Sequence, residues 1–483
     1  YRMLTAYSLY LAFKNKTFHS DGRFFIGVIS TGVYCRIICP SRSPSKNNSR
    51  FFLSAAAAEF AGFLLCHRCR PELAPTTLFS VERIAYIAAL LLETGASVTD
   101  ICRRLSIHKN HLQRIFKNEY GVAPMHYAQT HRLLTALRLL KDTQLPIRTV
   151  AMAAGFPNER RMSLLFNKRY NALPVAYRKV APLSIPSHIT LSLAYCPPYD
   201  WERILTFLNC HSLIDGIAMI ENGVYRRTVT IKECTGWIEI GHHADQHALS
   251  LRLPRCLYPV IREIIVRVRL LFDLDCDPVI SREQLNSLGR IHPGLRMPGA
   301  FNGFESSAAA ILAQHRSPDK TKAGLSAIAR TWGPAIKTPF SQLTCGFPDP
   351  VTISRLPPTA LRNIGLSPTE TYQVQTLAYL IANDIFYPDV LPDIMTQQQH
   401  LHRIAGIRPD AIHRITMHVM KHPDSFPTTP DAIEKLLSNT SHTMPPATRL
   451  LQKSTQWAPY RTYAFLHIWH ALQEGKEITQ FLQ

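Results

Sequence analysis

Short apolar runs and helical periodicities alternate along the chain and divide it into stretches of different kinds. The run Phe24–Ile29 predicts a buried strand, and the Ala-rich stretch 55–63 predicts a helix. From Ser80 onward the apolar residues take helical spacing, which gives way to strand-like alternation and then to helices again. Proline-rich stretches at 71–77 and 181–186 predict linkers. The pattern predicts a multidomain α+β protein with domains over 1–76, 80–180, 188–298 and 299–483.

The second stretch repeats one helical arrangement. A short helix ending at Leu105, a turn over 106–108 and an amphipathic helix over 109–118 predict a helix-turn-helix. The same order returns with Glu159–Tyr170 as its second helix, and a long helix over about 125–140 joins the two units. A helical bundle with solvated basic faces is the alternative. Two spaced repeats favour a double helix-turn-helix that reads successive major grooves.

The charge of the chain indicates a polyanionic partner. The formal net charge is +20 and the pI is near 9.6, which favours nucleic acid. The helix-turn-helix residues predicted to contact double-stranded DNA are Lys109, His111, Arg114, Lys117, Arg160 and Arg161. No apolar run reaches the roughly 18 residues of a membrane span, so no membrane contact is expected. The chain opens on Tyr1 without a signal-peptide pattern, and scattered cysteines predict reduced thiols and a cytoplasmic protein.

Two close cysteine pairs predict a metal site. Three residues separate Cys35 from Cys39, two separate Cys66 from Cys69, and twenty-six lie between the pairs. Four thiolates at such spacings suit tetrahedral Zn²⁺, which accepts sulfur at all four corners. The basic residues nearby, predicted to contact DNA, are Arg36, Arg42, Lys46 and Arg68. The first domain is therefore expected to be a small α/β domain held together by zinc.

The residues flanking the cysteines carry a family resemblance. Around the pairs stand Thr31–Cys39, Arg42, Asn48, Phe51 and Ala61–Cys69. Together they resemble the N-terminal domain of the Ada family. The resemblance implies that Cys35 takes a methyl group irreversibly from a DNA methylphosphotriester, while Cys39, Cys66 and Cys69 complete a zinc site. The family usually has Arg-Pro at Leu64–Leu65 and Pro at Ile37, so one phosphate contact is expected to be missing.

The implied chemistry agrees with the behaviour of thiolates. A thiolate is the nucleophile, and zinc keeps it deprotonated at neutral pH. Methylation makes Cys35 a thioether and reduces the formal charge of the zinc cluster from minus two to minus one. One unit charge about 10 Å from a phosphate, at an effective dielectric near 20, is worth roughly 1.7 kcal/mol. Methylation is therefore expected to raise the affinity for DNA, whereas a zinc site that only folds the domain is the structural alternative.

The double helix-turn-helix resembles the AraC-type DNA-binding domain. Gly155-Phe156 stands before the second recognition helix and Phe166 lies within it, as in that family. The resemblance implies that the protein reads an operator and activates transcription, with RNA polymerase as a partner. We expect the protein to be a monomer.

A third resemblance covers about 190–470. The segments that carry it are Leu193–Trp201, Leu271–Asp275, Pro293–Gly299, 309–314 and Trp457–Trp469. They resemble the AlkA-type 3-methyladenine DNA glycosylases. The resemblance implies a small sheet domain followed by an α-helical helix-hairpin-helix domain, which holds a flipped alkylated base in an aromatic pocket beside a catalytic aspartate. The residues predicted to line the base pocket are Gln314 and Tyr460.

The glycosylase-like part departs from its family at sites that matter. The hairpin over 404–410 has Arg408 where the family has a glycine. The glycine of the family lets backbone N–H groups approach a phosphate closely, and Arg408 fits that approach poorly. In an ungapped alignment the catalytic aspartate falls on Pro430, with Asp431 one residue later. A one-residue shift would make Asp431 catalytic. The alternative is that Asp431 stabilises the start of a helix.

These patterns together predict an alkylation-damage response protein. A suicide methyl acceptor that becomes a transcriptional activator would be fused to a glycosylase domain, active or decayed. The alternative is a zinc-containing AraC-type transcription regulator without catalytic activity. Stoichiometric methyl transfer to Cys35 separates the two.

Overall fold

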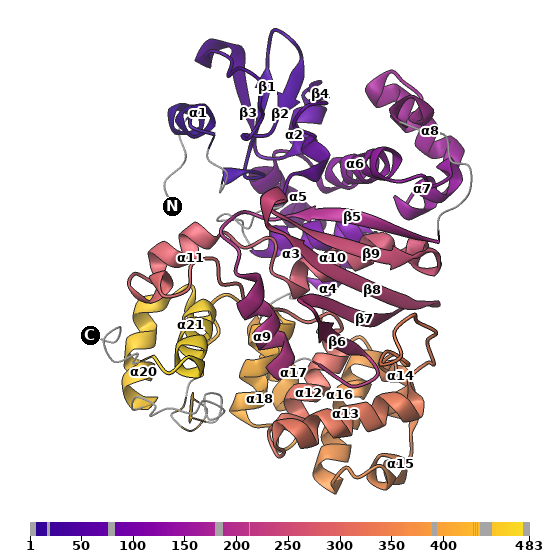
Figure 1. Ribbon diagram of the computed structural model, residues 1–483, viewed down its shortest axis with the longest axis vertical. Helices are drawn as coiled ribbons and strands as arrows, with labels where there is room; N and C mark the ends of the chain where they lie inside the picture. The colour runs from indigo at the N-terminus through magenta and orange to yellow at the C-terminus, as the bar shows by residue number, and fades with distance from the viewer. Residues whose placement is uncertain are drawn as a thin grey trace. The chain divides into compact units, whose positions relative to one another are not determined.

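The computed structural model describes residues 6–16, 20–75, 83–178, 187–211, 213–388, 394–427, 429, 431, 433–434 and 447–476 (Figure 1). The chain forms two compact units. Unit 1 comprises residues 1–197, 238–269 and 274–277, and unit 2 comprises 198–237, 270–273 and 278–483. Each unit takes in parts of more than one of the four predicted domains, whose boundaries stay predictions. No helix in the described ranges is long and apolar enough to cross a membrane.

Unit 1 begins with helix α1 and a small four-stranded sheet. The sheet has the order β3-β1-β2-β4, antiparallel except for the parallel pair β2·β4. The elements are α1 (Ala6–Lys14), β1 (Phe25–Val28), β2 (Val33–Cys35), β3 (Ser49–Phe52), α2 (Ala55–Phe60) and β4 (Leu64–Leu65). The predicted strand and the predicted helix are both confirmed as β1 and α2. Apolar side chains of Phe13, Phe24, Ile26 and Ile37 form a buried cluster that fixes the sheet.

Six α-helices follow and form the two helix-turn-helix units. Their bounds are α3 (Arg83–Thr94), α4 (Val98–Arg104), α5 (Lys109–Tyr120), α6 (Pro124–Asp142), α7 (Ile147–Ala153) and α8 (Glu159–Tyr170). Side-chain caps fix two of the starts, since Ser97 accepts from the Asp100 N–H and Asn158 from the Arg161 N–H. Gly121 ends α5 in the left-handed region, at φ 75°. The predicted pairs of helices are present as α4–α5 and α7–α8, with α6 between them.

A second, five-stranded sheet follows the second proline-rich stretch (Figure 1). Its strand order is β5-β9-β8-β7-β6. The elements are β5 (His188–Ala194), α9 (Trp201–His211), β6 (Ala218–Glu221), β7 (Val224–Ile231), β8 (Cys234–His243), β9 (Ala248–Pro254) and α10 (Ile261–Leu271). Alternate residues of β5 are buried and exposed, as expected for a strand with one face in a core. The strand-like alternation predicted for this part of the chain is confirmed by these strands.

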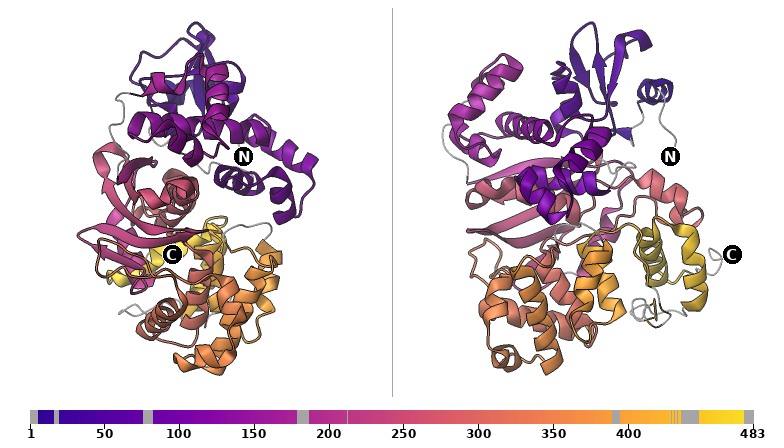
Figure 2. Two further views of the ribbon diagram at one scale, coloured as in Figure 1. Left: turned by 90° about the vertical axis from the view of Figure 1, so that its right-hand side faces the viewer. Right: turned by 180° about the vertical axis from the view of Figure 1, so that it is seen from behind.

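Helices make up most of unit 2 (Figure 2). They are α11 (Pro278–Gln284), α12 (Gly303–Ala313), α13 (Pro318–Trp332), α14 (Pro350–Arg355), α15 (Pro358–Asn363), α16 (Pro368–Ala382), α17 (Ile394–His402), α18 (Pro409–Arg414), α20 (Ala447–Ser454) and α21 (Arg461–Gln473). Buried Asp273 joins distant parts of this unit. It accepts hydrogen bonds from the Tyr463 hydroxyl at 2.9 Å and the Met297 N–H at 3.1 Å, and pairs with Lys421 at 2.8 Å.

Candidate metal centre and nucleic-acid interface

Four cysteines converge in unit 1. Their sulfur atoms all lie within 4.8 Å of one another, and all four side chains are buried. Cys35 ends β2 and Cys66 follows β4, so the parallel pairing of these strands brings the two cysteine pairs together. The Cys66 N–H donates to the Tyr34 carbonyl at 3.0 Å. The predicted convergence of Cys35, Cys39, Cys66 and Cys69 is confirmed.

The donor set fits zinc. Hydrogen bonding from Cys39 and Cys69, together with burial, raises the pKa of the Cys35 thiol far above its ordinary value. Four crowded sulfurs therefore need a divalent cation before all of them can be thiolates. Four thiolates with no oxygen ligand among them match the closed tetrahedral coordination of structural zinc. The Arg36 N–H donates to Cys69 Sγ at 3.3 Å and offers further stabilisation to that sulfur.

The side chain of Arg36 turns into the domain. It is 9% exposed, and its Nε donates to both carboxylate oxygens of Asp21, at 3.0 and 3.2 Å. Its Nη1 donates to the Cys69 carbonyl at 3.3 Å. The predicted contact of Arg36 with DNA would require this buried pair to open. Arg36 thus holds the backbone around the metal site in the structure.

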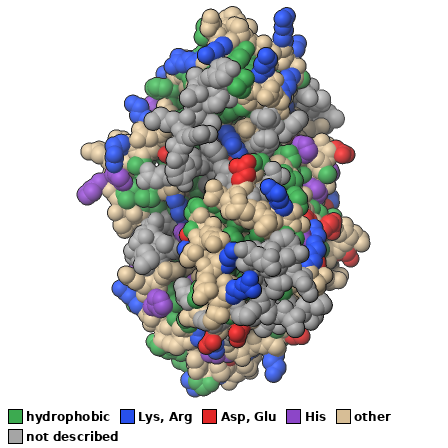
Figure 3. Space-filling view, turned by 90° about the vertical axis from the view of Figure 1, so that its left-hand side faces the viewer, with side chains coloured by type: hydrophobic (Ala, Val, Ile, Leu, Met, Phe, Trp, Pro, Cys, Tyr) green, Lys and Arg blue, Asp and Glu red, His purple; other side chains and the backbone are tan. Residues whose placement is uncertain are grey.

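The other basic residues near the cysteines stay on the surface. Arg42, Lys46 and Arg68 are all exposed, and Arg68 Nη1 donates to the Ser41 hydroxyl at 3.4 Å. Lys and Arg side chains are spread over the face seen in Figure 3. These three side chains remain candidates for contact with DNA phosphates next to the cluster.

The recognition helices present the predicted basic residues outward. On α5, Lys109, Arg114 and Lys117 are exposed, while Leu112 and Phe116 are fully buried. His111 is half-buried, and its Nδ1 lies 3.1 Å from Arg114 Nη2. On α8, Arg160 and Arg161 are exposed. Each helix thus has a buried apolar face and an exposed basic face, as a recognition helix needs to bind DNA. The contacts of these residues with DNA stay predictions.

A buried carboxylate on α2 was missed by the sequence reasoning. Glu59 is 4% exposed and accepts hydrogen bonds from the Tyr34 hydroxyl at 3.1 Å, the Tyr170 hydroxyl at 3.2 Å and Arg169 Nε at 3.0 Å. A single charged residue inside an Ala-rich helix was the available signal. The partners from α8 are 110 and 111 residues away in the sequence, so no local pattern could identify them.

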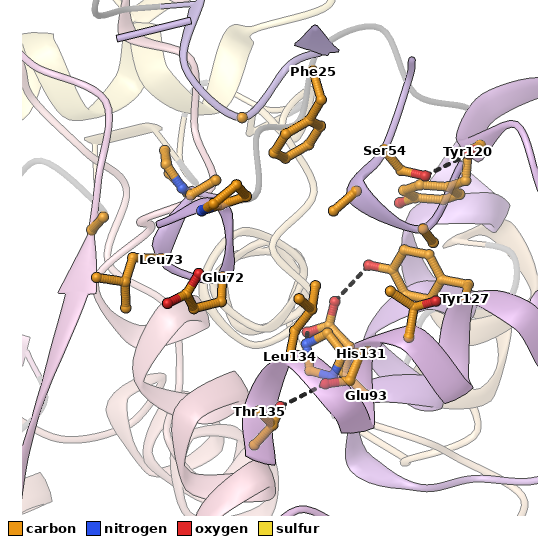
Figure 4. A pocket seen from close by; sticks show the side chains of 18 of the residues that line it. Phe25, Ser54, Glu72, Leu73, Glu93, Tyr120, Tyr127, His131, Leu134 and Thr135 are labelled. Atoms are coloured by element: carbon orange, nitrogen blue, oxygen red, sulfur yellow. Dashed lines mark hydrogen bonds and ion pairs between the residues drawn. The ribbon is translucent and has the colours of Figure 1, made fainter. Parts of the chain in front are cut away.

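A second buried carboxylate, Glu93 on α3, lines a cavity of about 810 Å³ (Figure 4). Glu93 accepts from the Tyr127 hydroxyl at 2.8 Å and pairs with Arg269 of α10 at 2.5 Å. Arg269 also binds both oxygens of Asp275, at 3.0 and 2.8 Å, and the Tyr86 hydroxyl donates to Asp275 at 3.0 Å. Burial raises the pKa of Glu93, but the charges of Arg269 and His131 and the hydrogen bonds from Tyr127 and Arg269 together hold that pKa below its ordinary value.

In unit 2 the structure places Gln314 beneath the hairpin. Gln314 is 3% exposed, its Nε2 donates to Gln373 Oε1 at 2.8 Å, and its Oε1 accepts from the Arg408 N–H at 2.8 Å. Gln373 Nε2 in turn donates to the Ala405 carbonyl at 3.1 Å. Both ends of the Gln314 amide thus hold the hairpin backbone. The base-pocket role of Gln314 stays a prediction.

The candidate catalytic residue of unit 2 lies at the surface. Asp431 is exposed and lies in a helical turn, whereas Pro430 lies outside the described residues. Tyr460 is half-buried immediately before α21, with its ring 6.2 Å from that of Tyr463. Nearby in sequence, Asp424 binds Arg461 through both carboxylate oxygens, at 2.7 and 2.8 Å. A catalytic role for Asp431 and a base-pocket role for Tyr460 stay predictions.

Comparison with family models matches three parts of the chain. Residues 8–72 match the metal binding domain of Ada, residues 101–180 match a helix-turn-helix domain, and residues 190–302 match the AlkA N-terminal domain. The fold and the four-cysteine site thus define a class of protein that joins a zinc-binding Ada domain, a DNA-binding helix-turn-helix and a glycosylase-like part.

Curated relatives support the same class. A probable bifunctional transcriptional activator/DNA repair enzyme AlkA of Mycobacterium tuberculosis is 27% identical over 489 residues, which cover 96% of each chain. The bifunctional transcriptional activator/DNA repair enzyme AdaA of Bacillus subtilis is 30% identical over 34% of this chain and 78% of its own. DNA-3-methyladenine glycosylase 2 of Escherichia coli is 28% identical over 58% of this chain and 96% of its own. The chain belongs to the family of bifunctional transcriptional activators/DNA repair enzymes that includes AdaA of Bacillus subtilis, and DNA is its partner.

Proposed function

We propose that Cys35 accepts a methyl group from a methylphosphotriester in DNA and that this converts the protein into a transcriptional activator. The observation that carries the proposal is the buried cluster of four cysteines with Cys35 at the end of β2. Exposed Arg42, Lys46 and Arg68 lie in the same cysteine-bearing loops and can bind the flanking phosphates.

The transfer needs no general acid. The Cys35 sulfur attacks the methyl carbon, the S–C bond forms as the C–O bond breaks, and the phosphodiester leaves as a stable anion. Zinc held by the four sulfurs would supply a thiolate at neutral pH. The product is a thioether, so each protein molecule reacts once.

The charge change of this reaction favours DNA binding. Loss of one thiolate charge removes one repulsive interaction with each nearby phosphate, worth roughly 1.7 kcal/mol at about 10 Å and an effective dielectric near 20. The exposed basic residues of α5 and α8 would then read the operator. Contact with RNA polymerase, a monomeric state and a cytoplasmic location complete the proposal.

The test is stoichiometric methyl transfer to the full chain. The protein is incubated with duplex DNA carrying a labelled methylphosphotriester, and the methyl groups per protein are counted by intact mass. Cys35→Ser is expected to take up none, whereas Cys210→Ser is the matched control because Cys210 is an exposed cysteine outside the cluster. Parent protein without methyl uptake would favour the alternative of a zinc-containing AraC-type regulator without catalytic activity.

We further propose that unit 2 acts on alkylated bases as a 3-methyladenine glycosylase through Asp431. Family membership supports the assignment, and the surface position of Asp431 leaves it accessible to DNA. The full chain is assayed for base release from methylated duplex DNA beside Asp431→Asn and a control, Asp384→Asn, at another exposed aspartate of the unit. Release that only Asp431→Asn abolishes supports the proposal. Absence of release from the parent, with DNA binding retained, makes this unit a DNA-docking remnant.

A further inference from the structure

Helix α2 of the cysteine-bearing domain contacts the C-terminal end of the second recognition helix, α8, through Glu59. The carboxylate is 4% exposed and accepts hydrogen bonds from Arg169 Nε at 3.0 Å and from the Tyr170 hydroxyl at 3.2 Å. Arg169 and Tyr170 are the last two residues of α8. Arg169 also donates to the Phe63 carbonyl, just beyond α2. These contacts hold the end of α8 against the cysteine-bearing domain.

The other end of α2 contacts the first recognition helix. The hydroxyl of Ser54, the residue before α2, donates to the carbonyl of Tyr120 at 2.7 Å, and Tyr120 is the last residue of α5. A Cβ added at Gly121, the next residue, would lie only 3.0 Å from the Ala57 Cβ, so the two backbones approach closely. The six residues of α2 span about 9 Å between the two contacts.

The same contacts lead to the cysteine cluster. Tyr34 donates to Glu59 at 3.1 Å, is 0% exposed, and immediately precedes Cys35 in β2. The ring of His67, between Cys66 and Cys69, lies 6.0 Å from the ring of Tyr177, seven residues after α8. Interiors of native density transmit displacement because they have few voids. A group added to buried Cys35 therefore displaces residues that contact the second helix-turn-helix.

We propose that α2 sets the separation of the two recognition helices and that Glu59 is its positioning residue. Through Tyr34 and Glu59, a change at Cys35 alters how α8 lies relative to α5. The link to Cys35 rests on the proposed function, whereas the spacing role of α2 does not. The ligand concerned is a duplex whose two halves must lie at one fixed separation.

The experiment uses the full chain and two duplexes. One duplex is selected by the parent protein from a randomised pool, and the other carries one added base pair between its two halves. The variants are Glu59→Gln and Tyr170→Phe, which weaken or remove contacts between α2 and the end of α8. Tyr177→Phe is the matched control, because it removes a neighbouring hydroxyl and keeps the ring beside His67. Zinc content and methyl uptake are measured for each protein.

The parent is expected to prefer the selected duplex. In Glu59→Gln the ratio of affinities for the two duplexes falls by at least about fivefold, which is the lower end of the coupling factors typical between two sites in one protein. In Tyr170→Phe this ratio falls by a smaller factor. Methylation of Cys35 shifts the preference of the parent and leaves that of Glu59→Gln unchanged. Zinc content and methyl uptake stay at the parent's level.

Several results would overturn the inference. A Glu59→Gln protein with normal zinc content and the parent's preference would exclude the spacing role. If Glu59→Gln loses zinc, the Tyr170→Phe protein decides the test. If Tyr170→Phe prefers the selected duplex as strongly as Tyr177→Phe does, the spacing role is excluded. A parent that accepts methyl without any shift in preference excludes the link to Cys35. If the parent accepts no methyl group, the proposed function is refuted. The spacing role of α2 is still tested, because the comparison of the two duplexes does not depend on methyl transfer.

Discussion

Replacing Arg269 by methionine is expected to destabilise unit 1 strongly at neutral pH. The guanidinium is 9% exposed and pairs with Glu93 at 2.5 Å and with Asp275 at 2.8 Å. Glu93 is 1% exposed and Asp275 is 3% exposed, so removal of the arginine leaves two buried carboxylates beside each other. Loss of one partner of a buried ion pair typically costs about 3–5 kcal/mol. That is a large part of the roughly 5–15 kcal/mol by which most domains are stable.

The pH dependence of this variant has a definite sign. With Arg269 in place, the pKa of Glu93 lies below its ordinary value, so this group stabilises the fold above its unfolded pKa and the contribution is lost as the pH falls through the folded pKa. Without Arg269, burial and mutual repulsion raise both carboxyl pKa values. The folded variant then binds more protons than the unfolded chain, so its stability falls as the pH rises. The loss is expected to be larger near pH 7 than near pH 5.

Urea unfolding of the full chain at the two pH values measures this effect. Arg255→Met is the control, because Arg255 is an exposed arginine that precedes the same helix. Adding Glu93→Gln to Arg269→Met removes one of the two carboxylates and is expected to restore part of the stability. Equal free energies of unfolding for Arg269→Met and Arg255→Met, or a loss that grows as the pH falls, would refute the reasoning.

Three further predictions follow from the sites. Removal of zinc by a chelator is expected to unfold residues 20–75, because the four ligands join the end of β2 to the loops that follow β2 and β4; far-ultraviolet circular dichroism and thiol titration check this, and unchanged spectra would contradict it. Gln314→Ala leaves the buried Gln373 Oε1 without its donor and the part-buried Arg408 N–H without its acceptor, and is expected to lower the free energy of unfolding of unit 2 by about 1–3 kcal/mol, whereas Gln452→Ala on exposed surface changes it little. Lys109→Gln and Lys117→Gln are each expected to reduce the slope of log affinity against log salt by about 1, measured by titration of duplex DNA; an unchanged slope would exclude phosphate contacts.

The sequence was sufficient where the determining residues lie close together or follow a period. The spacing of Cys35, Cys39, Cys66 and Cys69 predicted their convergence, because a metal site needs only the right donors at short separations. The helices α5 and α8 were also predictable, since their buried faces repeat every three or four residues.

The remaining features depend on partners far along the chain. Glu59 meets Arg169 across 110 residues, and Glu93 meets Arg269 across 176, so no local pattern identifies the partner of either buried carboxylate. Arg36 was predicted to contact DNA from its place beside Cys35, but Asp21 takes its side chain inward. The position of Gln314 beneath the hairpin depends on how α12, α16 and the hairpin pack, which local pattern does not encode.

The ion pair between Glu93 and Arg269 also bears on the history of the chain. Relatives carry the two parts as separate proteins, since the Bacillus subtilis protein covers 34% of this chain and the Escherichia coli glycosylase covers 58%. Here, a carboxylate on a helix of the first part is neutralised by an arginine on a helix of the second. Separating the two parts again would leave Glu93 without this arginine, whereas Arg269 would keep its pair with Asp275. The fused chain thus supplies Glu93 with an arginine that the first part alone does not contain at this site.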